Sequence, residues 1–254
     1  MDKAESLRDE YRIRFAKTAQ YRNNVWKILC DEYFSAFVSP EAHVLDLGSG
    51  WGEFINNVDA ARKYAMDLNP DAGRRLSGNT HFIHQDCSEE WQVRQESLDV
   101  VFTSNFLEHL PDKAHVERTL AQAHRCLKDD GLVICLGPNI KYVPGAYWDF
   151  WDHFIPLTEL SLSEVLKMKG FNIESCIPRF LPYSMSTGGN PPLFFVRLYL
   201  KLAPLWPLFG KQFLVVARKK RRVEQGAASN GDSAGVPLHR WRDRRAGYAP
   251  TFAR

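Results

Sequence analysis

Apolar and polar residues follow two different periods along this chain. In the first forty residues, apolar side chains recur every three to five positions between charged ones, which predicts helix over residues 3–38. Ser39-Pro40 ends this segment, because the residue before a proline is driven out of the helical region. We therefore expect an N-terminal helical lid over residues 1–40.

From His43 onward, short apolar runs alternate with amphipathic stretches. The runs predict β-strands over residues 43–47, 64–68, 81–85, 98–103, 132–137, 171–177 and 211–218. Helical patterns lie between most of them, over residues 52–60, 70–77 and 112–127. Such alternation requires a mostly parallel sheet covered on both faces. The expected fold is α/β, with a doubly wound sheet of seven strands.

Turn and cap residues mark several of these boundaries. Asn69-Pro70 matches an N-cap followed by proline at the first helical position. Asp130-Gly131 predicts a turn directly before the fifth strand. Ser161 to Glu164 form a capping-box pattern, which opens a helix that Gly170 closes.

Charge separates the body of the chain from a basic tail. Residues 218–254 carry ten Lys and Arg against three Asp and Glu, which exceeds the whole net charge of +3, so the remainder is mildly acidic. An acidic body offers a phosphate backbone no attraction, and we expect no nucleic-acid partner. Small and polar residues after residue 221 predict a disordered tail over residues 221–254. The main domain then covers residues 41–220.

Three features bear on location. The five scattered cysteines form no CxxC pair, which is typical of reduced thiols in a cytosolic protein. The charged N-terminus lacks the apolar core of a secretory signal. Residues 193–209 form an apolar insertion between the last two strands, but prolines and basic residues interrupt it, so it cannot span a bilayer. We expect a cytoplasmic protein in which this insertion packs on the domain, forms a homodimer contact, or touches a membrane surface through Arg197 and Lys201.

The sequence VLDLGSGWG, residues 44–52, runs from an apolar strand into a glycine-rich turn and then a helix. Glycine is required where the backbone adopts positive φ and approaches a ligand closely, and the amides of the following helix start face that ligand. Gly48, Gly50 and Gly52 are therefore candidate cofactor-binding residues. Asp46, at the strand end, either orients this loop or contacts the ligand directly.

The acids at later strand ends indicate a nucleoside cofactor. The dinucleotide fingerprint GxGxxG needs a small residue where this chain has Glu53, which argues against NAD. Asp67 ends the second strand, where a carboxylate can accept both hydroxyls of a ribose. Asp86 follows the third strand, where it can accept the adenine amine while the amide of Cys87 donates to the ring. These positions share the sheet edge at which such folds bind ligands.

Residues 43–137 resemble the class I S-adenosylmethionine-dependent methyltransferases of the type 11-like group. The family motif [V/I]LDxGxGxG is matched by residues 44–52, its strand-two acid by Asp67 and its acid after strand three by Asp86. Residues 99–105 match its fourth strand. The resemblance implies a Rossmann-like fold, S-adenosylmethionine as cofactor and methyl transfer as the reaction.

The resemblance also implies a role for each site residue. The glycine loop would hold the methionine part of the cofactor, Asp67 and Leu68 the ribose, and Asp86 and Cys87 the adenine. The carbonyl near Asn105 would face the ammonium group. These motifs specify the cofactor and leave the acceptor open; we expect a small-molecule, lipid-linked or glycan-linked acceptor, methylated at oxygen. The alternatives are a non-catalytic scaffold and a nicotinamide-dependent reductase, which would need a Tyr-x-x-x-Lys pair that the expected region lacks.

Two histidines are candidates for catalysis. His109 follows the fourth strand, where it is either a general base or a cap for the turn before Pro111. His153 ends the aromatic stretch 147–153, which we expect to form a lid over the acceptor pocket. The spacing of Asp149, Asp152 and His153 fits no metal template, so no metal is expected.

Overall fold

The computed structural model describes residues 18–183 and 190–221. Its strands are β1 (His43–Leu47), β2 (Arg62–Asp67), β3 (Thr80–His84), β4 (Leu98–Ser104), β5 (Leu127–Pro138), β6 (Phe171–Leu181) and β7 (Gln212–Lys219). Its α-helices are α2 (Ala19–Glu32), α3 (Glu53–Asn57), α4 (Lys113–Cys126), α5 (Glu159–Met168), α6 (Leu193–Lys201) and α7 (Trp206–Phe209). The first 17 residues of the expected lid and the expected tail from residue 222 lie outside this range.

The seven strands form one sheet in the order β3-β2-β1-β4-β5-β7-β6. The first five are parallel, and β7 runs antiparallel between β5 and β6. The prediction of a doubly wound, mostly parallel sheet is therefore confirmed. The strand order reverses between β1 and β4. Sheets of this kind bind ligands beyond the carboxyl ends of the strands at such a point.

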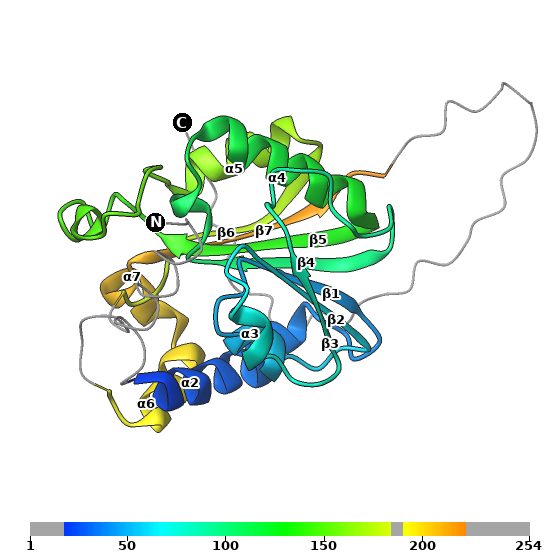
Figure 1. Cartoon of the computed structure of the whole chain (residues 1–254). Helices are drawn as coiled ribbons and strands as arrows, with labels where there is room; N and C mark the ends of the chain where they lie inside the picture. Colours follow the sequence, from blue (N-terminus) through cyan, green and yellow to red (C-terminus); the bar gives the residue numbers. More distant parts are fainter. Residues whose placement is uncertain (1–17, 184–189, 222–254) are drawn as a thin grey trace, which may run out of the picture. The chain divides into compact units, whose positions relative to one another are not determined.

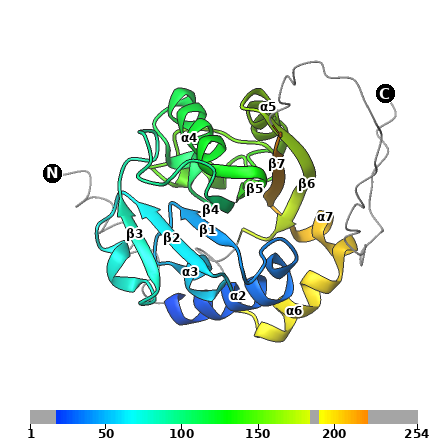
Figure 2. The same ribbon diagram turned by 90° about the vertical axis from the view of Figure 1, so that its right-hand side faces the viewer.

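Helices cover both faces of the sheet. α4 and α5 lie on one face, and α2, α3 and α6 lie on the other (Figures 1 and 2). Each layer has its own buried apolar cluster: Leu120 and Leu166 belong to the first, while Leu29 and Phe54 belong to the second. The apolar runs of the strands are buried from both sides, as a parallel sheet requires.

One expected helix is too short to be an α-helix. Residues 70–77 contain the 3-10 helix η3 (Ala72–Arg75) instead. The side chain of Asn69 accepts a hydrogen bond from the amide of Asp71 at 3.0 Å, so it closes a local turn and does not cap a helix. Gly73 disfavours helix at the next positions. The turn at Ser77 then leads directly into β3, so the 3-10 turn cannot extend into an α-helix.

Several other boundaries also differ from the prediction, including those at the capping box and at Asp130-Gly131. α5 begins two residues before Ser161, because the capping box uses Thr158 as N-cap and Ser161 as its third residue. β5 begins at Leu127, before Asp130-Gly131. Asp130 has φ 62° and the β4–β5 register shifts beside it, so the expected turn is an irregularity near the start of the strand.

The apolar insertion 193–209 folds into α6, the 3-10 helix η6 (Ala203–Leu205) and α7. α6 packs on α2, and its Leu200 is buried. Arg197 forms an ion pair with Glu32 of α2. The large apolar side chains that it leaves exposed are Phe194, Phe195, Leu198, Leu202, Leu208 and Phe209. The insertion therefore both packs on the domain and presents an apolar surface.

Candidate functional site

The glycine loop joins β1 to α3 at the point where the strand order reverses. Gly48, Gly50 and Gly52 have φ of 70°, 52° and 75°, a region that side-chain-bearing residues rarely adopt. A Cβ on Gly48 would lie 2.2 Å from the ring of Phe106. Glycine is thus required by both backbone conformation and space, as the sequence predicts.

Asp67 ties the end of β2 to this loop. One carboxylate oxygen accepts from the amide of Gly50 and the other from the amide of Asn69, both at 2.8 Å. Burial raises the pKa of Asp67, while the amides of Asn69 and Gly50 act in the opposite direction. Each carboxylate oxygen accepts more than one hydrogen bond, so Asp67 keeps acceptor capacity for ribose hydroxyls.

Asp46 lies under α3, with only 3% of its surface exposed. Burial, followed by the charge of Glu53, holds the pKa of Asp46 well above its usual value, and the Ile55 amide opposes this shift. Glu53 pairs with Arg22 of α2 at 2.8 Å. Asp46 therefore lies in the interior between β1 and the start of α3. The sequence carries no signal for the pairing of Arg22 with Glu53.

Asp86 and Cys87 follow β3 at the same edge of the sheet. Asp86 accepts from the amide of Ser88 at 2.8 Å, which fixes the turn. The buried Cys87 thiol lies 3.3 Å from the hydroxyl of Thr119, and its carbonyl accepts from the indole of Trp91 at 2.7 Å. Cys87 is thereby held in place by its side chain and its carbonyl.

Two residues just beyond the ends of β1 and β4 each have a buried oxygen with no hydrogen-bond partner among the described residues. These oxygens are Oγ of Ser49 and Oδ1 of Asn105. Leu47 of β1 pairs with Thr103 of β4. Ser49 and Asn105 each lie two positions beyond this pair, at the point where the strand order reverses. Asn105 also has φ 49°. Because a buried unpaired acceptor is costly, this edge fits a ligand that brings hydrogen-bond donors, as the ammonium group of S-adenosylmethionine does.

His109 and His153 come together beside this edge. Their ring centroids are 4.8 Å apart. His109 belongs to the 3-10 helix η4 (Leu107–His109) after β4, and His153 to the loop after β5. Nδ1 of His109 contacts the carbonyl oxygen and a carboxylate oxygen of Asp152, at 2.9 and 3.1 Å. Burial lowers the pKa of His109, but the Asp152 hydrogen bond and the charge of Glu108 outweigh it and raise the pKa.

The aromatic stretch 147–153 is divided between core and surface. Tyr147 is fully buried, and its hydroxyl donates to the carbonyl of Ile155. Trp148 and Trp151 are 55% and 91% exposed. Only part of the stretch is therefore available to cover an acceptor.

Comparison with known proteins identifies the class that this fold and this loop define. A family model described as a methyltransferase domain matches residues 19–175 of the 254. That is more than half of the chain, and the protein belongs to this family. It is a methyltransferase. A search of curated protein sequences found no match.

Solved structures share the fold at low sequence identity. A SAM-dependent methyltransferase from Archaeoglobus fulgidus is 20% identical, with 81% of this chain and 99% of that chain covered and a TM-score of 0.60. A chain from the complex between the Haloferax volcanii Trm112 methyltransferase activator and a putative methyltransferase is 15% identical, with coverages of 87% and 99% and a TM-score of 0.61. A possible histamine N-methyltransferase from Thermotoga maritima is 15% identical, with coverages of 83% and 99% and a TM-score of 0.59.

Proposed function

We propose that this protein transfers a methyl group to a hydroxyl oxygen of an acceptor that carries a long apolar chain. The observation behind this acceptor class is a cavity of about 640 Å³ between α2, α6 and the end of β6. Most of its lining is apolar, including Val25, Leu29 and Phe195, and Lys211 supplies a charge. Such a cavity suits a hydrocarbon chain, because burying apolar surface is what favours binding there.

A short chain of ring contacts links this cavity to the two histidines. Tyr183 lines the cavity, and its ring centroid lies 6.2 Å from that of Phe150. Phe150 in turn stacks on His153 at 5.0 Å. An acceptor whose chain lies in the cavity would thus extend its polar end toward His153.

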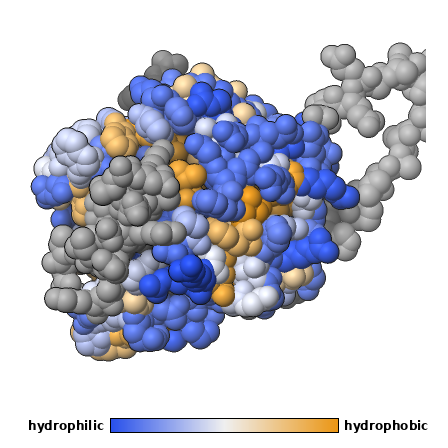
Figure 3. Space-filling view, in the orientation of Figure 1, coloured by the Kyte–Doolittle hydropathy of each residue, from blue (hydrophilic) through white to orange (hydrophobic). Residues whose placement is uncertain are grey.

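The exposed apolar side chains of α6 and α7 support a lipid acceptor. Soluble proteins rarely leave so many large apolar residues together at the surface without a partner. Part of this surface lies over α6, at the lower left of Figure 3. Trp148, Trp151 and Phe154 add a second exposed group. We propose that these groups rest on a membrane surface, where a lipid acceptor resides. Among residues 18–183 and 190–221, no helix has the length and apolarity needed to cross a membrane.

The cofactor would lie along the switch-point edge of the sheet. The glycine loop and the free acceptors of Ser49 and Asn105 would hold its methionine part. Asp67, with Leu68 beside it, would hold the ribose. Asp86 and the amide of Cys87 would hold the adenine. The fit rests on the positive φ values of the loop and on the two buried oxygens that need donors.

The chemistry then requires little covalent participation by the protein. S-adenosylmethionine, when bound, supplies an activated methyl group. The cavity and the aromatic loop would hold the acceptor hydroxyl in line with it. His109 and His153 are the titratable pair beside that position, and we assign them the acceptor's proton. Asp152 orients His109 for this role.

The test is methyl transfer from labelled S-adenosylmethionine into fractionated cell extract. We expect label in the organic-solvent fraction, as a methyl ether. Val25→Trp, which fills the cavity, should reduce this transfer while S-adenosylhomocysteine still binds. Lys27→Trp, two residues along on the exposed side of α2, is the matched control. Label confined to aqueous metabolites, or to protein, would overturn the proposed acceptor.

A further inference from the structure

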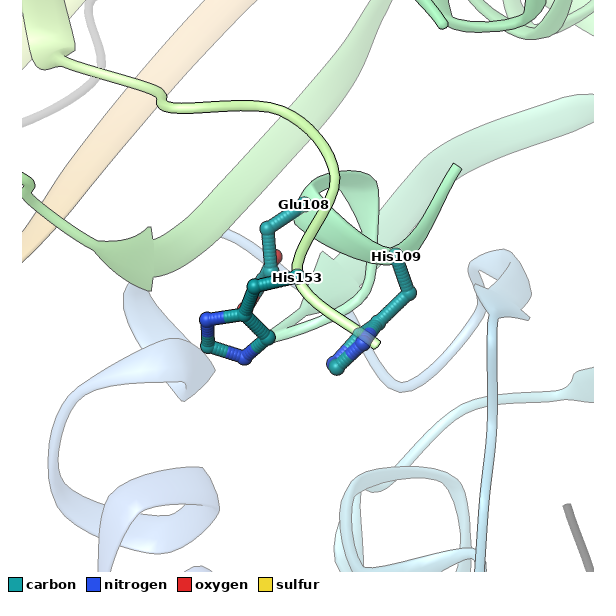
Figure 4. A group of neighbouring side chains, drawn as sticks. All are labelled: Glu108, His109 and His153. Atoms are coloured by element: carbon teal, nitrogen blue, oxygen red, sulfur yellow. The ribbon is translucent and has the colours of Figure 1, made fainter. Parts of the chain in front are cut away.

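Glu108, His109 and His153 place three metal-ligating side chains around one point (Figure 4). Each offers one donor atom, and these atoms all lie within 4.8 Å of one another. We propose that the three side chains bind a first-row divalent transition-metal cation. The sequence does not predict this site, because one ligand, His153, comes from the loop after β5 and lies far along the chain from the other two.

The donor set is two imidazole nitrogens and one carboxylate oxygen. This combination binds Zn²⁺, Mn²⁺, Co²⁺ or Fe²⁺, and three protein ligands leave coordination positions open. Mg²⁺ and Ca²⁺ prefer sites made wholly of oxygen. The chemistry of the ligands therefore points to a transition metal with room for an exogenous oxygen.

The spacing fits a site that tightens when the ion binds. Bonds of about 2.0–2.2 Å to a common ion place donor atoms at most ~4.4 Å apart, and ~3.3–3.6 Å apart at tetrahedral angles. Donor atoms separated by the observed limit of 4.8 Å would therefore move together by roughly 0.4–1.5 Å when the ion binds. His153 lies in the loop after β5, and a small movement of this loop would bring its ring nitrogen toward the other two donors.

Backbone contacts hold the two halves of the cluster against each other. The carbonyl of Glu108 accepts from the amides of Phe154 and Ile155, at 2.9 and 3.2 Å. The loop that carries His153 is thereby fixed to the turn that carries Glu108 and His109. A metal site needs this kind of support, since its ligands must be placed before the ion arrives.

Asp152 acts as an outer partner of the site. It contacts Nδ1 of His109 through its carbonyl oxygen and its carboxylate, which leaves Nε2 of His109 for the ion. Metal-binding histidines are regularly oriented by a carboxylate or carbonyl at the other ring nitrogen. His109 has this arrangement.

Burial gives a second reason for a cation at this point. Glu108 is 2% exposed and His153 6% exposed. A buried carboxylate is costly unless it is paired, and a divalent cation would compensate its charge. With the ion bound, the two imidazoles would be ligands and would no longer accept the acceptor's proton. The open coordination positions would instead take the acceptor's oxygen and lower the pKa of its hydroxyl. The binding of the acceptor's oxygen to the ion rests on the function proposed above, whereas the binding of the ion itself does not.

The experiment is titration of the full chain, first stripped with EDTA, with Co²⁺ alone. We expect one Co²⁺ per chain, with visible d–d absorption and paramagnetic shifts of the imidazole NMR signals of His109 and His153. The signal of His115, which pairs with Asp112 at 2.8 Å, should shift far less, because His115 would not coordinate the ion. Glu108→Gln and His153→Gln should each weaken Co²⁺ binding at least about tenfold. His115→Gln should leave it unchanged.

Binding of S-adenosylhomocysteine to the same preparations reports whether each variant is folded. The proposal is overturned if the wild-type chain binds no stoichiometric Co²⁺, or if the signals of His109 and His153 do not shift. Unchanged affinity in folded Glu108→Gln and His153→Gln would also overturn it, and would leave the cluster as an imidazole–carboxylate pair. Because no acceptor is present, these results are independent of the proposed function.

Discussion

Gly48 is the residue at which backbone and packing constraints coincide most closely. Its φ of 70° lies in the left-handed region, and the ring of Phe106 occupies the space that a Cβ would need. The glycine pattern of the loop is readable from sequence for this reason. The position of Phe106, which closes the loop from the β4 side, is not readable, because it depends on the pairing of two strands far apart in the chain.

We expect Gly48→Ala to lower the free energy of unfolding by about 1–3 kcal/mol, since it adds backbone strain and a steric clash. It should also weaken binding of S-adenosylhomocysteine. Gly78→Ala is the control, because nothing lies within 4 Å of a Cβ built there. Urea denaturation of both variants provides the measurement. Equal stability of the two would contradict the constraint assigned to Gly48.

Asp46 predicts a pH dependence of stability. Burial, and then the charge of Glu53, hold the pKa of Asp46 well above its usual value in the folded protein. A raised folded pKa contributes stability that is complete below the unfolded value of about 3.9 and is lost as the pH rises through the folded pKa. Asp46→Asn carries no such charge. We expect it to be more stable than the wild type at neutral pH, with the difference shrinking toward a pH of about 4. Denaturation curves that differ equally at every pH would show that the charge of Asp46 is not the cause.

Among the helices and strands, the sequence predicts best those whose bounds depend on the local pattern of apolar and polar residues. β1 has the predicted bounds, and β4 and β7 differ from them by one residue at one or both ends. The prediction of an α-helix over residues 70–77 is wrong, because the turn at Asn69 and the presence of Gly73 restrict this segment to one 3-10 turn. The cluster of Glu108, His109 and His153 is also not predictable, since 44 positions separate the histidines and only the fold brings them together.

The ion pair between α2 and α3 gives a prediction at this scale. Arg22 and Glu53 are 13% and 11% exposed, so the pair is largely removed from water. Loss of one partner leaves the other charge uncompensated. We expect Arg22→Gln to lower the free energy of unfolding by about 1–3 kcal/mol. Lys27→Gln removes an exposed pair from the same helix, with Asp31, and should cost well under 1 kcal/mol. If thermal or urea denaturation ranks the two variants the other way, α2 is not anchored through Arg22.

For the molecule as a whole, the distribution of exposed apolar side chains predicts membrane association. The surface of α6 and α7 should bind vesicles, and Phe194→Ser with Phe195→Ser should weaken that binding at least tenfold, since two large apolar groups are lost. Arg197 is paired with Glu32, so Lys201 should carry most of the dependence on anionic lipid. Liposome flotation with and without anionic lipid measures both effects. A wild-type protein that never floats and sediments as a dimer would instead assign this surface to a homodimer contact.

The position of the cofactor site is tested most directly by calorimetric titration with S-adenosylhomocysteine. The wild type should bind one molecule per chain, and NAD should give no heat. Asp67→Ala should lose about 1.5–3 kcal/mol of binding free energy, because hydrogen bonds to a charged acceptor are removed; the exposed Asp31→Ala should lose none. NAD binding in place of S-adenosylhomocysteine, or an Asp67→Ala variant with unchanged affinity, would contradict a cofactor site built on the glycine loop and Asp67.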